Sequence, residues 1–344
     1  MVELDALLEV QGLRTHFFTR EGVVRAVDGV DLTVRPARTV CVVGESGCGK
    51  SVTARSILGL VDRPGRIVEG KILFHRAGAV GDGQPAPVDL VALDPRGEEM
   101  RGIRGGEISM IFQEPVASLS PMYTIGSHLV ETIQLHTTMD KRAARAHAID
   151  MLRRVGIVRP EQRFDSYSFQ LSGGMCQRAM IAMALACGPS LLIADEPTTA
   201  LDVTTQARIL DLIRDLQSQT NMAVLFITHD LGVVAEIADE VVVMYLGTVV
   251  ERGMVDEIFH DPKHPYTQAL LRSIPTIGAG TRQRLTPIRG MVPHPSDRPA
   301  ACPYHPRCDS FIAGLCDVQD PPTVEVNPGH TARCVLYAPA EAAL

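Results

Sequence analysis

Eight consecutive residues have the types and spacing of a loop that binds nucleotide phosphates. The segment Gly44-Glu-Ser-Gly-Cys-Gly-Lys-Ser51 fits the pattern G-x-x-x-x-G-K-[ST]. Its glycines let backbone N–H groups surround the phosphates, and the start of the following helix adds a favourable partial charge. Lys50 is expected to neutralise the β- and γ-phosphates and Ser51 to ligate Mg²⁺. A glycine-rich turn without this function is the alternative interpretation, and the predicted strand before the loop and helix after it argue against that alternative.

An acidic pair ends a second apolar run. The segment Leu191-Leu-Ile-Ala-Asp-Glu196 has the pattern of a buried strand that ends in two carboxylates. Asp195 is expected to hold Mg²⁺, directly or through water, and Glu196 to orient and polarise the attacking water of phosphoryl transfer. Such a pair is also typical of a solvated turn or helix start, so its significance depends on the loop at 44–51.

A serine and two glycines precede a predicted helix over 175–187. Ser172, Gly173 and Gly174 offer a hydroxyl and backbone N–H groups to an anion. A simple helix cap would explain an isolated Ser-Gly-Gly equally well, and the interval to the acidic pair is what suggests a further role.

The elements that position these residues alternate between strand and helix. Short apolar runs predict buried strands at 39–43, 191–194 and 223–228, and a hairpin is predicted over 240–252. Helical patterns are predicted at 50–60, across 121–189 and between the last two strands, where Ile209, Leu210, Ile213 and Leu216 form the core face. This alternation predicts an α/β fold with a largely parallel sheet covered on both faces.

The composition limits the class of protein. The chain has 344 residues, of which 45% are hydrophobic, and a net charge of −7 from 33 basic and 40 acidic residues. This excludes a disordered chain and a general basic footprint for nucleic acid. No run approaches the ~18 apolar residues of a membrane span, and residues 1–5 lack a signal-peptide pattern, so a cytoplasmic protein is expected unless a partner holds it at a membrane. An exposed insertion is predicted over 78–99, and order is predicted to fade beyond about 259.

Four cysteines lie in the last 43 residues, at Cys302, Cys308, Cys316 and Cys334. Their proline-rich surroundings offer little apolar area to bury, and such segments usually need a metal or another staple. Four thiolates suit an iron–sulfur cluster or tetrahedral zinc, and the C-x5-C-x7-C-x17-C spacing does not choose between them. Free or disulfide-linked cysteines are the third alternative. His305 and His330 are interpreted as surface residues and not as ligands.

In their order along the chain, these motifs resemble those of ATP-binding cassette (ABC) ATPases, and the resemblance covers nearly the whole chain. Six motifs match: Walker A at 44–51, the Q-loop at Gln113, the signature at 171–175, Walker B ending at Asp195-Glu196, the D-loop at Ala200-Leu-Asp202 and the switch histidine, His229. The segments 111–121, 195–202 and 264–271 are similar to the ATPase subunits of dipeptide and oligopeptide importers, and nickel importers share much of this pattern.

The resemblance implies an α/β fold with a P-loop NTPase core of the ABC type, an antiparallel β-subdomain and a helical signature subdomain at about 121–190. A nucleotide-binding domain over 1–260 would be followed by a small Cys-rich C-terminal extension over 261–344, with a [4Fe–4S] cluster favoured over zinc. Cassette ATPases also stack adenine on an aromatic residue, whose usual place falls near Glu21, with Phe17 and Phe18 a few residues earlier.

The resemblance also implies roles for single residues in a dimer that holds two ATP molecules between its subunits. Glu196, His229 and Gln113 would be catalytic, and Ser51, Gln113 and Asp195 would hold Mg²⁺. Ser172, Gly173 and Gly174 would contact the nucleotide of the partner. The remaining nucleotide contacts would come from Gly44, Glu45, Ser46, Gly47, Cys48, Gly49, Lys50, Ser51, Val52, Gln113, Asp195 and Asp202.

The partners and cargo implied are those of a peptide importer. Such an ATPase pairs with a second, homologous ATPase subunit on two transmembrane permeases at the cytoplasmic face of the membrane, fed by an extracytoplasmic binding protein. ATP hydrolysis would power the uptake of di- and oligopeptides, and nucleic acid is not an expected partner. The alternatives are an importer of nickel or another small solute, a non-transport ABC ATPase, a simple P-loop kinase and a redox sensor built around the cysteines.

Overall fold

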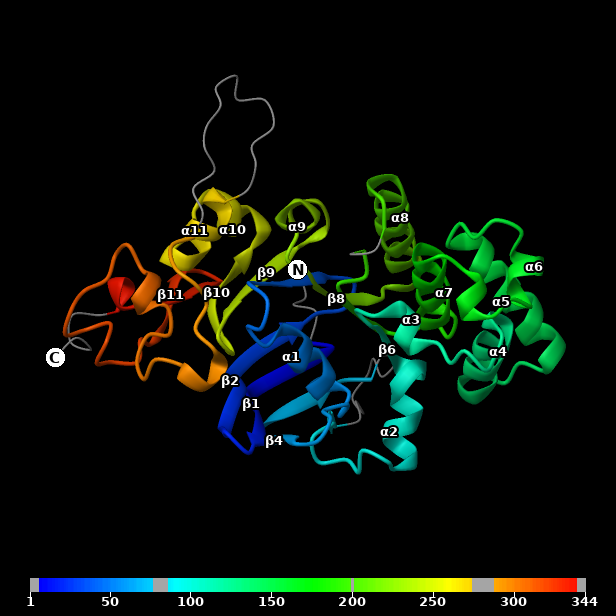
Figure 1. Ribbon diagram of the computed structural model, residues 1–344, viewed down its shortest axis with the longest axis horizontal. Helices are drawn as coiled ribbons and strands as arrows, with labels where there is room; N and C mark the ends of the chain where they lie inside the picture. The colour runs from blue at the N-terminus through cyan, green and yellow to red at the C-terminus, as the bar shows by residue number, and fades with distance from the viewer. Residues whose placement is uncertain (1–5, 77–85, 199–200, 274–287, 339–344) are drawn as a thin grey trace, which may run out of the picture. The chain divides into compact units, whose positions relative to one another are not determined.

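The computed structural model describes residues 6–76, 86–198, 201–273 and 288–338 (Figure 1). The chain divides into two compact units. Unit 1 comprises Met1–Leu8, Thr33–Arg38 and Leu73–Ile227. Unit 2 comprises Glu9–Leu32, Thr39–Ile72 and Thr228–Leu344. Residues 1–5, Ala200 and residues 78–85 of the expected insertion lie outside the described residues.

Unit 2 contains the first predicted strand, β3 (Thr39–Val43), whose five residues are all buried. β3 runs parallel to β9 (Glu240–Tyr245), with Val42 opposite Val242. β9 turns at Leu246-Gly247 into β10 (Thr248–Met254), which pairs with it antiparallel. The predicted strand and hairpin are therefore confirmed.

A second sheet has most of its residues in unit 2, in the strand order β2-β1-β4. β1 (Leu8–Thr19) and β2 (Gly22–Val34) are neighbours joined by only two residues, a connection that requires antiparallel strands. β4 (Gly65–Phe74) lies on the other side of β1, and its last residues pair antiparallel with β5 (Val88–Asp89). This sheet is the antiparallel β-subdomain expected of the fold.

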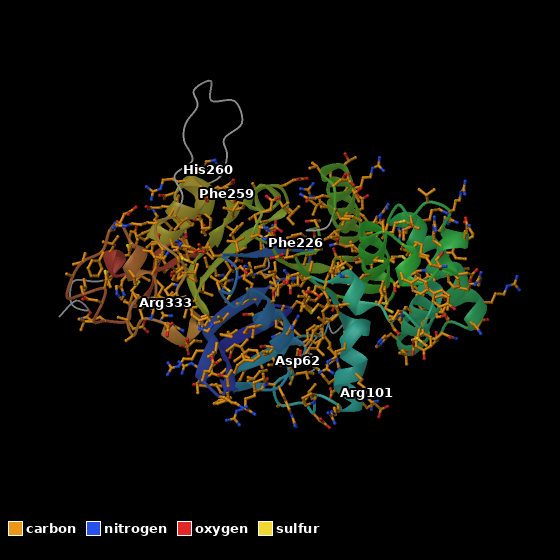
Figure 2. The ribbon with its side chains drawn as sticks, viewed as in Figure 1. Asp62, Arg101, Phe226, Phe259, His260 and Arg333 are labelled. Carbon is orange, nitrogen blue, oxygen red and sulfur yellow. The ribbon has the colours of Figure 1, made fainter. Side chains whose placement is uncertain are left out.

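Unit 1 contains a parallel sheet in the order β8-β7-β6. Every residue of β6 (Ile108–Ile111), β7 (Leu191–Asp195) and β8 (Ala223–Ile227) is buried, as continuous apolar runs predict for a parallel sheet; Phe226 on β8 is labelled in Figure 2. α8 (Val203–Thr220) connects β7 to β8 and buries Ile209, Leu210 and Ile213, whereas Leu216 is half-buried.

The remaining helices of unit 1 confirm the helical region predicted over 121–189. Its helices are α4 (Ile125–His136), α5 (Lys141–Arg154), α6 (Pro160–Phe164) and α7 (Gly173–Leu185), which lie together in green in Figure 1. α5 ends before Gly156, which has the left-handed conformation typical of the residue after a helix end, with φ of +75°. Shorter helical segments precede and follow α4–α6: α2 (Glu98–Gly102), η1 (Ile103–Glu107), α3 (Pro115–Ser118) and η2 (Ser168–Gln170).

Unit 2 also holds the helix after the phosphate loop, the helix before β9 and two helices after β10. They are α1 (Lys50–Ile57), α9 (Leu231–Ile237), α10 (Val255–His260) and α11 (Pro265–Arg272). The predicted helix over 50–60 is confirmed and ends three residues early. Among the described residues, no helix is long and apolar enough to cross a membrane.

The end of the chain is more regular than its sequence predicts. A hairpin of β11 (Thr323–Asn327) and β12 (His330–Arg333) extends the sheet of unit 2, because β12 pairs antiparallel with β10. Three short turns, η3 (Pro295–Asp297), η4 (His305–Arg307) and η5 (Val335–Tyr337), connect the rest. The expected loss of order beyond 259 is therefore wrong for these residues. Strands of four and five residues are too short for alternation of apolar and polar residues to indicate them. The boundary between 260 and 261 stays a prediction.

Candidate functional site

The predicted phosphate loop lies between β3 and α1 of unit 2, and its glycines are required by close backbone contacts. Gly44, Gly47 and Gly49 have φ values of +149°, +79° and +100°. A Cβ atom added to Gly44 would lie 2.3 Å from the carbonyl oxygen of Met244. A Cβ atom added to Gly49 would lie 2.2 Å from the carbonyl oxygen of Ala26. The loop is therefore fixed against the backbone of β9 and β2.

Lys50 is the first residue of α1 and is held over this loop. Its ammonium group donates to the carbonyl oxygens of Gly44 (2.7 Å) and Glu45 (3.1 Å), and only 6% of the residue is exposed. The thiol of Cys48 lies 3.8 Å from the same ammonium, and burial raises the pKa of that thiol. Lys50 thus places a positive charge at the loop, and its contact with the β- and γ-phosphates stays a prediction.

The other predicted loop residues differ in exposure. Ser46 and Gly47 are exposed, whereas Ser51 and Val52 at the start of α1 are half-buried. Gly49 is the N-cap of α1 and provides no side-chain cap, so the positive end of the helix dipole is directed at the loop. Backbone N–H groups and this dipole favour bound phosphate.

Unit 1 contains the acidic pair, and the structure brings it together with the Q-loop glutamine. Asp195 is the last residue of β7 and is 1% exposed. Glu196 follows it with φ of +49°, and its backbone N–H donates to Ile227 (2.9 Å). The side-chain amide of Gln113 donates to the carboxylate of Glu196 (3.1 Å). A carboxylate oriented in this way is suited to position a water molecule for attack.

The signature segment caps α7, as the simpler interpretation predicts. Ser172 is the N-cap, and its hydroxyl accepts from the backbone N–H of Met175 (3.4 Å). The helix therefore begins at Gly173, two residues earlier than predicted. Ser172 and Gly173 are exposed at this N-terminus, which leaves them accessible to an anion. Gln177 of the same helix donates to the carbonyl oxygen of Pro197, directly after the acidic pair.

Asp202 and His229 complete the predicted set. Asp202 is exposed and caps α8, accepting from the backbone N–H (3.0 Å) and the hydroxyl (2.7 Å) of Thr205. These hydrogen bonds lower the pKa of the Asp202 carboxyl. His229 is exposed in unit 2, before α9, and Ala200 of the D-loop lies outside the described residues.

Four buried or half-buried thiols line one small pocket in unit 2, together with His264 and Tyr304. The sulfur of Cys316 accepts from the backbone N–H of Ile312 (3.4 Å). The backbone N–H groups of Tyr304, Ser310 and Leu336, each two residues further on, act to lower the thiol pKa values of Cys302, Cys308 and Cys334, against the larger effect of burial. Burial raises the pKa values of Cys302 and Cys334 to about 11. Within the described ranges, no group of three or more His, Cys, Asp or Glu has the geometry to hold a metal ion.

Two further expectations concern the exposure of His330 and the residue that stacks on adenine. His330 is fully buried and bonds through Nε2 to the buried carboxylate of Glu251 (2.8 Å), so its interpretation as a surface residue is wrong. Phe18 is 39% exposed beneath the guanidinium of Arg66, 4.3 Å from its ring centre, and Glu21 is exposed. The residue that stacks on adenine stays a prediction.

The sequence reasoning missed two residues that bond to Glu45. Arg307 forms an ion pair with the carboxylate, and the hydroxyl of Tyr266 accepts from the backbone N–H of Glu45 (2.9 Å). These residues lie 262 and 221 positions from Glu45, so no local spacing could have indicated them.

A phosphate loop with an ordered lysine, an acidic strand end and a capped Ser-Gly-Gly helix define an ATP-binding cassette. The ABC transporter family model matches residues 27–199, and the model for the C-terminal region of oligopeptide/dipeptide transporters matches residues 250–316. The chain belongs to the ABC transporter family and is an ATPase of that family.

Named relatives extend the match over nearly the full length. The oligopeptide transport ATP-binding protein AppD of Bacillus subtilis is 47% identical over 335 residues, which cover 97% of this chain and 98% of AppD. The dipeptide transport ATP-binding protein DppD of Escherichia coli is 46% identical over 329 residues, which cover 96% of each chain. Among solved structures, a dimeric ATP-binding cassette in a post-hydrolysis state with ADP and phosphate aligns with a TM-score of 0.63 and 25% identity, covering 72% of this chain and 98% of that one.

Proposed function

We propose that this chain is the ATP-hydrolysing subunit of an importer for di- and oligopeptides. The observation that carries the proposal is the match of residues 250–316 to the C-terminal region of oligopeptide and dipeptide transporters. Relatives named for peptide transport support it, because they cover both the cassette and this C-terminal region. The chain would supply the motor, while permeases and a binding protein would select the cargo.

The proposed mechanism assigns a task to each placed residue. Lys50 and the N–H groups of the loop bind the β- and γ-phosphates, and Glu196, oriented by Gln113, positions the attacking water. His229 would contact the γ-phosphate. Phosphoryl transfer needs positioning and charge stabilisation more than covalent chemistry from the protein. These residues would supply both functions.

Magnesium fits the donor set proposed for it. Ser51, Gln113 and Asp195 offer hydroxyl, amide and carboxylate oxygens, which are the ligands that Mg²⁺ prefers. When bound, the ion would neutralise charge on the phosphates. The signature residues, Ser172 to Gly174, would serve the nucleotide of a second ATPase subunit.

The proposed assembly is the one that the family resemblance implies. This chain would pair with a homologous ATPase subunit on two permeases at the cytoplasmic face of the membrane, with an extracytoplasmic binding protein delivering the peptide. The decisive experiment reconstitutes these components and measures ATP hydrolysis with and without di- and oligopeptides. Stimulation by peptides supports the proposal. Stimulation only by nickel chelates would mean that this ATPase belongs to a nickel importer. Glu196→Gln in this chain is the control for hydrolysis by a contaminant.

We further propose that Cys302, Cys308, Cys316 and Cys334 bind a [4Fe–4S] cluster. The observation that supports this is that the four cysteines line one pocket, and four thiolates are the ligand set of such a cluster. Because burial raises the pKa values of Cys302, Cys308 and Cys334, loading the site should release protons. Anaerobically purified protein should contain about four iron and four acid-labile sulfide per chain. Zinc without iron would reject the cluster.

A further inference from the structure

Glu45, the second residue of the phosphate loop, is held at its backbone and at its side chain. Its N–H donates to the hydroxyl of Tyr266 (2.9 Å), and its carbonyl oxygen accepts from Lys50 (3.1 Å). Its carboxylate forms two hydrogen bonds with Arg307, of 2.7 and 3.0 Å. The residue that touches the phosphate-binding lysine is therefore fixed from outside the loop.

The guanidinium of Arg307 is held by hydrogen bonds on all sides; Arg307 and Tyr266, which both bond to Glu45, are called the clamp below. A guanidinium has five N–H donors, and in Arg307 each has an acceptor. Two donors bond to Glu45, one to the hydroxyl of Tyr245 (3.3 Å), and two to the backbone carbonyls of Arg289 (2.9 Å) and Gly290 (3.4 Å). Only 4% of the residue is exposed. A bidentate arginine buried in this way fixes both distance and orientation.

The clamp belongs to the C-terminal region and is supported by aromatic packing. Tyr266 lies in α11 and Arg307 in η4, both between residues 250 and 316. The ring of Tyr304 lies 5.2 Å from each of the rings of Tyr245 and Tyr266, which lie 4.7 Å apart. All of these residues belong to unit 2, together with the loop.

We propose that Arg307 is a positioning residue for nucleotide binding. It fixes Glu45, and through the Glu45 carbonyl it sets the place of Lys50. It also neutralises the Glu45 carboxylate, which would otherwise be an unpaired negative charge in a loop that must accept a polyphosphate. The C-terminal extension thereby becomes a determinant of ATP affinity. This inference concerns the ATPase site itself and holds for any cargo.

The test compares ATP affinity in the purified full-length chain, measured by a fluorescent ATP analogue at temperatures well below unfolding. Arg307→Met should raise the Kd about tenfold, because it leaves the Glu45 carboxylate unpaired. Arg307→Lys keeps the charge but not the two-pronged geometry, and should weaken binding by an intermediate factor. The double variant Arg307→Met/Glu45→Gln removes the uncompensated charge and should recover most of the affinity.

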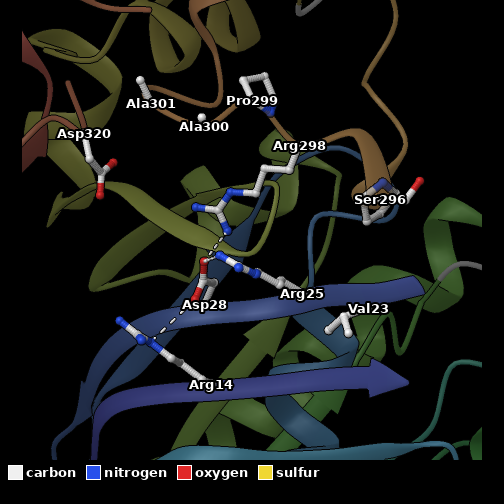
Figure 3. A pocket seen from close by; sticks show the side chains of 11 residues that line it. Arg14, Val23, Arg25, Asp28, Ser296, Arg298, Pro299, Ala300, Ala301 and Asp320 are labelled. Carbon is white, nitrogen blue, oxygen red and sulfur yellow. Dashed lines mark hydrogen bonds and ion pairs between the residues drawn. The ribbon is translucent and has the colours of Figure 1, made fainter. Parts of the chain in front are cut away.

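The chain offers a matched control in a second buried arginine. Arg298 also comes from the C-terminal region and pairs with Asp28 of β2 at 2.8 Å, with 14% of its side chain exposed (Figure 3). It lines a pocket with Arg14 and Arg25, whose guanidinium groups also approach Asp28, and it makes no hydrogen bond or ion pair with Glu45 or Lys50. Arg298→Met should lower the melting temperature and leave the Kd for ATP unchanged.

Two results would overturn the proposal. In the first, Arg307→Met lowers the melting temperature but binds ATP as tightly as the unaltered chain, which would make Arg307 a structural residue alone. In the second, Arg298→Met weakens ATP binding as much as Arg307→Met, which would show a general loosening of unit 2. If Arg307→Met does not fold, Arg307→Lys decides by the same comparison, and an unchanged Kd there counts against the proposal.

Discussion

The side-chain amide of Gln113 donates to the carboxylate of Glu196 over 3.1 Å. The two residues are 83 positions apart and meet because each follows the carboxyl end of a strand, β6 and β7, which are parallel neighbours. Parallel strands bring their carboxyl ends to one edge of a sheet, where ligands bind in open α/β folds. The carboxylate thus has a fixed orientation in unit 1.

Glu196→Gln should abolish turnover while leaving ATP binding intact. The amide keeps the size of the side chain and loses the charge that polarises water, so kcat should fall by at least about a hundredfold. Steady-state phosphate release in the assembled complex measures this, and the Kd for ATP should change by less than about threefold. Turnover near that of the unaltered protein would remove Glu196 from the chemistry.

Lys50→Ala should weaken nucleotide binding itself. The ammonium lies over the loop, held by the carbonyl oxygens of Gly44 and Glu45, and nothing else in the loop carries a positive charge. The Kd for ATP should rise by at least about tenfold. Lys71→Ala, which alters an exposed lysine of β4 in the same unit, should bind ATP normally. Equal affinities for the two variants would contradict the role of Lys50.

Gly49→Ala and Gly47→Ala form a pair that separates steric clash from backbone strain. Both glycines have positive φ, but a Cβ at Gly49 would lie 2.2 Å from the Ala26 carbonyl, whereas a Cβ at Gly47 meets nothing within 4 Å. Gly47→Ala should cost about 1–2 kcal/mol in the free energy of unfolding, and Gly49→Ala clearly more. Denaturant unfolding of both variants checks the order, and a reversed order would refute it.

Glu251→Ala should be among the most destabilising single changes in unit 2. Its buried carboxylate accepts from the backbone N–H groups of Lys263 (2.6 Å) and His264 (2.9 Å) and from His330. Removing it leaves the donors of His264 and His330 buried without an acceptor, at a cost of about 3–5 kcal/mol. Asp320→Ala, which breaks the more exposed pair with Arg333, should cost less than about 1 kcal/mol. If thermal unfolding shows that the two variants lose similar stability, then burial of the ion pair does not determine the cost of breaking it.

Local patterns predicted much of this protein, because the features concerned are local. Strand β3, the phosphate loop and the start of α1 are consecutive, so apolar runs and glycines indicate them directly. The same holds for β7 with its two acids. The predicted start of α7 lies two residues too late, because Ser172 caps the helix and the two glycines form its first turn.

Long-range polar contacts could not be predicted from patterns. The bond between Arg307 and Glu45 depends on how β9, α11 and η4 pack, and a single arginine beside a cysteine carries no sign of its partner. The prediction for His330 is wrong for the same reason. A histidine in a polar segment is expected to be exposed, and its buried partner Glu251 is 79 positions away in the sequence. Burial of single polar residues is decided by tertiary packing.

The pairing of β12 with β10 has a practical consequence for anyone who shortens this protein to its cassette. A chain that stops at residue 260 would lose Lys263, His264 and His330 together, and with them the three donors to the Glu251 carboxylate described above. It would also leave β10 as a bare edge strand, the kind of surface on which chains stack and precipitate. Insolubility of such a fragment would therefore reflect an exposed sheet margin and not a defective nucleotide site.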